Sequence, residues 1–141
     1  MIRELNETDI GQVADIWLDT NITAHDFIPA QYWRDNFDAV KEMFKQAEIY
    51  VYEDGKNIQG FIGLNKDYIE GIFVTDKAQS QGIGRLLLDF VKDRKKELHL
   101  SVYEKNTRAI RFYQREGFEI QCEHLDENTG EKDYVMIWKQ K

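Results

Sequence analysis

The 141-residue sequence contains only one cysteine and one proline, and both scarcities exclude classes of protein. Because Cys122 has no second cysteine to pair with, no internal disulfide can form and no cysteine-based metal site can be assembled. We therefore expect a protein of a reducing, cytoplasmic compartment. With a single proline and 13% aromatic residues, the composition also differs from that of disordered chains.

Long apolar runs and an excess of basic residues are lacking as well. No run approaches the roughly 20 residues that a membrane-spanning helix needs, and the N-terminal segment 1–5 lacks the basic and apolar parts of a signal peptide. The 26 acidic residues outnumber the 19 basic ones, which gives a formal charge of −7. Nucleic acids and anionic membranes bind basic surfaces, so we expect neither as a partner, whereas an acidic surface suits a cationic, amine-bearing substrate.

The chain length and the 42% hydrophobic content are those of one globular domain, which we expect to span residues 1–141. After a short strand at 2–5, apolar residues at helical spacing predict helices that begin near residues 10 and 29, with the irregular segment 21–28 between them. The segments 49–52, 58–64 and 68–75 read as strands, and the Asp54-Gly55 turn makes the first two a hairpin. These three strands predict an antiparallel meander.

A strand–helix–strand crossover follows the meander and places the strand at 98–102 parallel to the strand at 68–75. The apolar face of the crossover helix is predicted to consist of Ile83, Leu86, Leu87, Phe90 and Val91. A helix at 106–116 and two strands at 118–125 and 133–139 complete the chain. We therefore expect an α/β (α+β) fold with a mixed, mostly antiparallel seven-stranded sheet and about four helices.

The turn that opens the crossover helix has the sequence Gln79-Ser-Gln-Gly82-Ile-Gly84-Arg85. Its two glycines allow backbone N–H groups to converge, and a helix N-terminus attracts anions, so the turn can bind a phosphate. Dinucleotide-binding turns need a third glycine where Leu87 stands, and ATP-binding phosphate loops need Gly-Lys-Ser/Thr, which is absent. Both common nucleotide-binding motifs are excluded, and a purely steric role of the glycines in a tight turn is the alternative.

A second motif lies on the helix at 106–116. Asn106 and Tyr113 are seven residues, or two helical turns, apart, so they project from nearly the same face about 10 Å apart along the axis. This helix follows the strand next to the glycine turn, and we therefore expect both motifs at the same end of the sheet. The alternative is structural, with Asn106 as a helix cap and Tyr113 packed in the core beside Ala109 and Ile110.

Together the two motifs resemble those of the GNAT superfamily of acyl-CoA-dependent N-acetyltransferases, over nearly the whole chain. The hallmark Gln/Arg-x-x-Gly-x-Gly/Ala is met by Gln79, Gly82 and Gly84. The later Asn-x-x-Ala-x-x-Phe/Leu-Tyr-x-x-x-Gly-Phe pattern is met by Asn106, Ala109, Phe112, Tyr113, Gly117 and Phe118. The resemblance implies a GNAT-like sheet whose parallel fourth and fifth strands splay apart, with acetyl-CoA as cosubstrate and no metal.

In similar proteins the pyrophosphate of coenzyme A lies on the glycine turn, and the pantetheine arm pairs with the preceding strand as an added strand would. The resemblance therefore assigns cofactor binding to Ile72, Phe73, Val74, Gln79, Ser80, Gln81, Gly82, Ile83, Gly84, Arg85 and Asn106. It also implies that Tyr113 is the general acid. A phenol with an ordinary pKa of about 10 is protonated at neutral pH and can protonate the departing thiolate.

The general base has several candidates. Glu70 alternates with Ile72 and Val74 along its strand, so we expect its carboxylate on their face, where it could act through water; a solvated surface carboxylate is the alternative. His25 is the second candidate, and an amine that arrives already deprotonated would need no base. Some members of the superfamily carry an acidic side chain on the fifth strand, near the position of Ser101, and a serine cannot replace it.

The resemblance places the acceptor between the first two helices and the turn of the last two strands. Substrate-binding roles are expected for His25, Phe27 and Trp33, with Trp17, Tyr134 and Trp138 nearby. The implied activity is that of an acyltransferase (EC 2.3.1.-), monomeric or homodimeric, which acetylates a primary amine of a small molecule or peptide. A silent acyl-CoA-binding or sensing module is the alternative and would not need Tyr113. A toxin that acetylates aminoacyl-tRNA would require a more basic surface.

Overall fold

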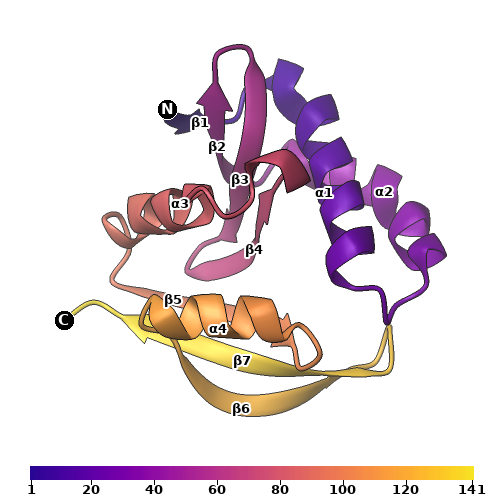
Figure 1. The fold of residues 1–141 in the computed structure, drawn as a ribbon, viewed down its shortest axis with the longest axis vertical. Helices are drawn as coiled ribbons and strands as arrows, with labels where there is room; N and C mark the ends of the chain where they lie inside the picture. The colour runs from indigo at the N-terminus through magenta and orange to yellow at the C-terminus, as the bar shows by residue number, and fades with distance from the viewer.

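The computed structural model describes residues 1–141 and contains one seven-stranded sheet with the strand order β1-β2-β3-β4-β5-β7-β6 (Figure 1). The strands are β1 (Ile2–Glu4), β2 (Glu48–Asp54), β3 (Asn57–Asn65), β4 (Tyr68–Val74), β5 (Glu97–Tyr103), β6 (Glu119–Asp126) and β7 (Glu131–Lys139). The helices are α1 (Ile10–Ala24), α2 (Ala30–Phe44), α3 (Ile83–Lys92) and α4 (Thr107–Arg115). The expected mixed sheet, with β4 and β5 as its parallel pair, is confirmed.

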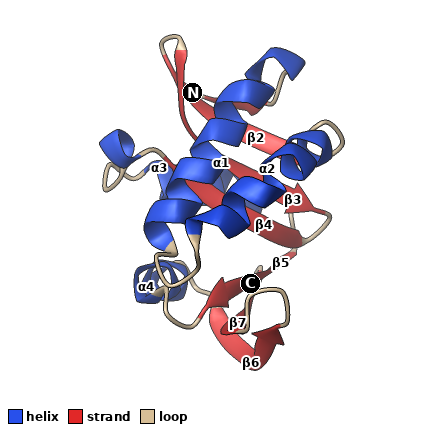
Figure 2. Cartoon of the chain, turned by 90° about the vertical axis from the view of Figure 1, so that its right-hand side faces the viewer, coloured by secondary structure: helices blue, strands red, loops and turns tan.

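Helices α1 and α2 cover one face of the sheet because each carries a single apolar stripe. Figure 2 shows both helices crossing the β2–β4 part of the sheet, while β6 and β7 extend beyond them. Helix α1 is longer than predicted and ends at Ala24, so the irregular connection is confined to residues 25–29. Asn21 lies within the helix, and its side-chain amide donates to the carbonyl of Trp17 at 2.9 Å.

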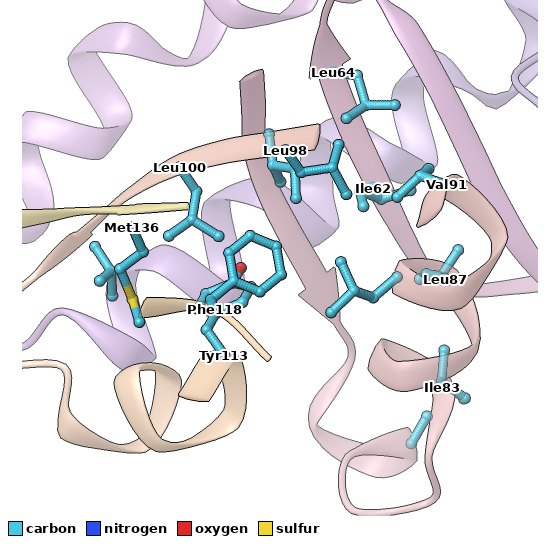
Figure 3. Close-up of a cluster of buried hydrophobic side chains, with 14 residues drawn as sticks. Ile62, Leu64, Ile83, Leu87, Val91, Leu98, Leu100, Tyr113, Phe118 and Met136 are labelled. Carbon is cyan, nitrogen blue, oxygen red and sulfur yellow. The ribbon is translucent and has the colours of Figure 1, made fainter. Parts of the chain in front are cut away.

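Helices α3 and α4 cover the opposite face and share one hydrophobic core with the sheet (Figure 3). The α3 residues in this core are Ile83, Leu87, Leu88 and Val91. The predicted α3 face was wrong at two positions, since Leu86, which was included, is 48% exposed and Leu88, which was not, is fully buried. The buried stripe is centred on the four-residue spacing of Ile83, Leu87 and Val91, which leaves Leu86 at its rim. None of the helices combines the length and apolar character needed to cross a membrane.

The parallel pair β4 and β5 is joined over a very short distance. Tyr68 pairs with His99 and Ile69 with Leu100, and no pairing continues beyond them. Strand β5 pairs along its whole length with β7 instead. The remainder of β4, from Glu70 to Val74, therefore separates from β5, and the expected splay of the two strands is confirmed.

A β-bulge marks the point where the two strands separate. On β4, Ile69 pairs with Leu64 and Gly71 with Gly63, so Glu70 is an extra residue without a partner on β3. A Cβ added to Gly63 would lie 3.9 Å both from the Cβ of Glu70 and from the side chain of Ile49, which belongs to the core beneath α1 and α2. Glu70 therefore begins on the α1–α2 face of the sheet.

This placement corrects the predicted position of Glu70. Ile72 and Val74 pack against the core of α3 and α4, on the other face of the sheet. The prediction of a shared face assumed strict alternation along β4, and the bulge shifts that alternation by one residue.

Candidate active site

A cleft of about 790 Å³ lies where β4 separates from β5, between the turn before α3 and the first turns of α4. Its walls come from elements that are distant in the sequence but adjacent in the fold (Figure 1). The lining residues are Ala24, Ile72, Val74, Ala78, Gln79, Ser80, Gly82, Ile83, Gly84, Arg85, Asn106, Arg108, Ala109, Phe112, Tyr113, Arg115 and Glu116. The two sequence motifs therefore meet in one cavity.

Gly82 shapes the turn that closes one end of this cleft. It is the N-cap of α3 and has a φ of 82°, in the left-handed region that glycine adopts without strain. The first N–H groups of α3 have no partners within the helix, and the residues that carry them, Ile83, Gly84 and Arg85, line the cleft. Anion binding by this turn stays a prediction, and the start of α3 at the cleft is compatible with it.

Most of the predicted cofactor residues line the cleft, and two do not. The ring of Phe73 lies on the other face of the sheet, with its centroid 4.9 Å from that of Phe61. The side-chain amide of Gln81 points back into the turn and donates to the carbonyl of Lys77 at 3.3 Å. Any contact of Phe73 with the cofactor is thus limited to its backbone, which is the part that the resemblance implied.

Arg108 is a cleft residue that the sequence reasoning missed. In the first turn of α4, its guanidinium donates to Gln79 Oε1 at 3.0 Å and to Ser80 Oγ at 3.3 Å. It is the basic side chain that connects α4 to the glycine turn across the cleft. A cation two residues after Asn106, in a chain with net negative charge, was the available signal.

Tyr113 is both a core residue and a cleft residue, so the two alternatives considered for it are compatible. Its ring packs edge-on against Phe112 and also against Phe118, beside which it lies in Figure 3. The residue is 8% exposed. Burial, with a smaller contribution from Tyr68, raises the pKa of Tyr113 above its ordinary value. The phenol therefore stays protonated at neutral pH, the state in which it could donate a proton.

Tyr68 influences the titration of Tyr113 and is itself influenced by two carboxylates, Glu70 and Asp133. Burial is the main cause that raises the pKa of Tyr68, and hydrogen bonding with Ser101 opposes it. The negative charges of Glu70 and Asp133 raise it further, so both carboxylates lie near the Tyr68 hydroxyl. The pKa of Glu70 is itself raised, because part of its surroundings excludes water.

Asp133 is a buried carboxylate that the sequence reasoning did not single out. On β7 it pairs with Tyr103 of β5 and with His124 of β6. The residue is 7% exposed, and its Oδ1 has no hydrogen bond, although His124 Nδ1 lies 3.3 Å away. With Glu70, it makes the α1–α2 side of the splay acidic.

His25 lies between the cleft and an aromatic cluster. Its ring stacks on Trp33 with centroids 5.4 Å apart, and it meets Phe27 and Tyr103 edge-on at 5.7 and 5.1 Å. Its Nε2 lies 3.2 Å from Asn106 Nδ2, and burial lowers the pKa of His25 to about 4. The imidazole is therefore neutral at neutral pH, and its Nε2 is already engaged.

The three predicted substrate-binding residues, His25, Phe27 and Trp33, are brought together by the fold. Tyr103 completes their cluster and was missed because strand β5 runs one residue further than predicted. The prediction for Tyr134 and Trp138 was wrong, since both pack against the core of α3 and α4, on the opposite face of the sheet. On β7, Tyr134 pairs with Val102 of β5 and Trp138 pairs with Leu98. Paired residues point to the same face of a sheet, and Val102 and Leu98 belong to the core of α3 and α4.

Comparisons with known proteins identify relatives along the whole chain. The family model for acetyltransferase (GNAT) domains matches residues 45–120. Peptidyl-lysine N-acetyltransferase YiaC of Escherichia coli K12 is 36% identical over 141 residues, covering 98% of this chain and 96% of the relative. The solution structure of apo YjaB from Escherichia coli superposes with a TM-score of 0.86 at 23% identity, over 97% of this chain and 95% of that one. The structure of PaiA N-acetyltransferase from Thermoplasma acidophilum in complex with coenzyme A gives a TM-score of 0.82 at 15% identity, over 99% of this chain and 98% of that one.

Proposed function

Because this chain belongs to the GNAT acetyltransferase family, we propose that it transfers the acetyl group of acetyl-CoA to the side-chain amine of a lysine in a peptide or protein. The observation that carries the proposal is the cleft at the splay of β4 and β5, which has an anion-binding turn at one end and a buried phenol, Tyr113, in its wall. The lysine acceptor is supported by the similarity to a peptidyl-lysine N-acetyltransferase over 98% of the chain.

The cleft suits the separate parts of coenzyme A. The pyrophosphate would lie on the N–H groups between Gln79 and Arg85, at the positive end of the α3 dipole, with Arg108 beside it. The pantetheine arm would run along β4 from Ile72 to Val74. Since β5 does not pair with this part of β4, its backbone groups are free to bind an extended ligand as a neighbouring strand would.

Acetyl transfer requires a neutral amine, which attacks the thioester carbonyl and forms the amide bond as the carbon–sulfur bond breaks. Tyr113 would donate its hydroxyl proton to the departing thiolate, and the amine would lose its own proton to a base. The buried phenol can do this because it remains protonated throughout the neutral pH range. Without a proton donor the leaving group would be a free thiolate in a partly desolvated site.

Glu70 is the better supported base of the two considered. It follows Ile69, the last residue of β4 that pairs with β5, and its charge affects the Tyr68 hydroxyl. Its raised pKa brings the carboxylate closer to the working pH of a general base. His25 is a poor base because burial lowers its pKa to about 4 and because its Nε2 is engaged by Asn106. We therefore assign His25 no part in proton transfer.

The acceptor would approach from the α1–α2 side of the sheet. Asp133 pairs there with Tyr103 of the aromatic cluster, and Glu70 begins on the same face. Carboxylates attract the ammonium form of lysine, and aromatic faces pack against its methylene chain. This arrangement also agrees with the net charge of −7.

A competition experiment tests the acceptor class. Purified protein would receive acetyl-CoA together with equal concentrations of spermidine and of a peptide with a blocked N-terminus and one lysine. We expect acetyl transfer mainly to the lysine, and no transfer to a matched peptide in which arginine replaces lysine. Faster acetylation of spermidine, or of an unblocked peptide N-terminus, would overturn the lysine assignment.

A further inference from the structure

One hydrogen-bond chain crosses from the cofactor cleft to the aromatic cluster on the acceptor side. The side-chain Oδ1 of Asn106 accepts from the N–H of Ala109 at 3.2 Å and caps α4. This bond fixes the orientation of the Asn106 amide, so its Nδ2 faces His25 Nε2, 3.2 Å away. Because an amide nitrogen can only donate, Nε2 must accept, and the proton of the neutral imidazole resides on Nδ1.

The His25 ring is held in a single orientation. Its Nδ1 is buried without a hydrogen-bond partner, so the contact with Asn106 is the one hydrogen bond that the ring makes. A ring flip would place a C–H group against Asn106 Nδ2 and would lose that bond. The backbone is held as well, since the N–H of His25 donates to Asn21 O at 2.9 Å and its carbonyl accepts from the N–H of Ile28 at 3.0 Å.

The three aromatic neighbours of His25 come from three different elements. Phe27 lies in the connection between α1 and α2, Trp33 on α2, and Tyr103 at the end of β5. At the other end of this hydrogen-bond chain, Asn106 lines the cofactor cleft, and so does Ala24, the residue before His25. A ligand that fixes Asn106 would therefore restrain a ring around which the aromatic cluster is built.

We propose that His25 is a positioning residue that couples the two binding sites, so that coenzyme A bound beside Asn106 raises the affinity of the aromatic cluster for the acceptor peptide. The inference rests on the proposed function for its acceptor. Each ligand would contact one partner of this hydrogen bond and favour the bonded arrangement, which is the arrangement in which the other ligand binds. The coupling is reciprocal, and the acceptor must strengthen coenzyme A binding by the same factor.

The test measures the dissociation constant of a lysine peptide by titration calorimetry, with and without saturating coenzyme A, which cannot react. We expect at least a fivefold tighter complex with coenzyme A for the unaltered protein. In His25→Phe, which keeps an aromatic ring but cannot accept the bond, the ratio should fall to about one. In His25→Gln, whose side-chain oxygen can accept from Asn106, the ratio should be largely restored.

Phe27→Leu is the matched control, because it alters the aromatic cluster without touching Asn106. It should weaken peptide binding in both conditions and leave the ratio unchanged, which separates coupling from a merely structural role. A ratio of about one in the unaltered protein, or an unchanged ratio in His25→Phe, would overturn the proposal.

A second measurement needs no acceptor and so separates this inference from the proposed function. The ring nitrogens of ¹⁵N-labelled His25 should show the Nδ1-protonated tautomer by NMR, and the Nε2 resonance should shift when coenzyme A is added. The opposite tautomer, or a resonance that does not respond to coenzyme A, would contradict the coupling even if lysine peptides are acetylated. Failure to acetylate lysine with a responsive His25 would remove only the proposed acceptor.

Discussion

Arg108 donates a hydrogen bond to Gln79 Oε1 over 3.0 Å and so joins the two walls of the cofactor cleft. Gln79 opens the glycine turn before α3, while Arg108 lies in the first turn of α4, 29 residues later. A second bond to Ser80 Oγ, at 3.3 Å, holds the same guanidinium over the turn. The cleft thus places a fixed cation where we propose that the cofactor phosphates bind.

Replacing Arg108 with glutamine should raise the KM for acetyl-CoA by about tenfold, since a hydrogen bond to a charged group contributes about 1.5 kcal/mol or more. The kcat at saturating acetyl-CoA should change little, because Arg108 is not proposed to contact the reacting atoms. Arg111→Gln removes the same charge from an exposed position of α4 outside the cleft and is the control. Equal effects of both substitutions would show that only net charge matters.

Removing the hydroxyl of Tyr113 should abolish most turnover without loss of cofactor binding. We expect Tyr113→Phe to lower kcat by about 100-fold or more, the usual contribution of general acid catalysis. The dissociation constant for coenzyme A should stay within about twofold. Tyr134→Phe, which loses a hydroxyl bonded to Glu104 on the same face of the sheet but outside the cleft, should keep full activity. Unchanged kcat in Tyr113→Phe would exclude it as the acid.

Glu70 should govern the acid limb of the pH profile. Its raised pKa means that protonation, and loss of the base, begins at a higher pH than for an ordinary glutamate. The kcat/KM of the unaltered protein should therefore fall as pH decreases through this raised pKa. Glu70→Gln should lower the plateau of kcat/KM and remove that limb, whereas Glu127→Gln, in the exposed β6–β7 turn, should leave both intact. If the acid limb of kcat/KM persisted in Glu70→Gln, the titration behind it would belong to a group other than Glu70.

Burial of His25 should make the protein sensitive to mild acid. Its folded pKa of about 4 lies below the unfolded value of 6.5, so the unfolded chain binds the extra proton between these values. The free energy of unfolding therefore has its full value, as far as His25 is concerned, above pH 6.5, and it decreases as pH falls toward 4. Chemical unfolding at several pH values should show a decrease of up to about 3 kcal/mol from this group. The decrease should be smaller in His25→Phe, and an identical pH dependence would contradict the lowered pKa.

The order of elements and the position of the cleft follow from local patterns in the sequence. The Asp54-Gly55 turn, the glycine turn and the cap at Asn106 each act within a few residues. The structure contains both predicted turns, and it contains the cap, which was the structural alternative for Asn106. Asn106 and Tyr113 reach the same cavity because helical spacing and the crossover rule are strong constraints. Such features require no knowledge of what packs against them.

The details that were missed depend on contacts between distant segments. Strict alternation assigned Glu70 to the wrong face. Gly71 in this strand is compatible with a bulge, but the position of the bulge is decided by pairing with β3. Arg108 could not be assigned to the cleft without knowing how α4 approaches the glycine turn. The hydrogen bond between His25 and Asn106 spans 81 residues and could not be inferred from either local motif.

The central claim is that this cleft supports acetyl transfer and not only cofactor binding. The most direct measurement is mass spectrometry of a single-lysine peptide after incubation with purified protein and acetyl-CoA, with free thiol release followed in parallel. We predict that the peptide gains the mass of one acetyl group in step with thiol release, and that both almost disappear in Tyr113→Phe. Coenzyme A binding without acetylation of any lysine peptide or other amine would contradict this account and would identify a silent acyl-CoA-binding module.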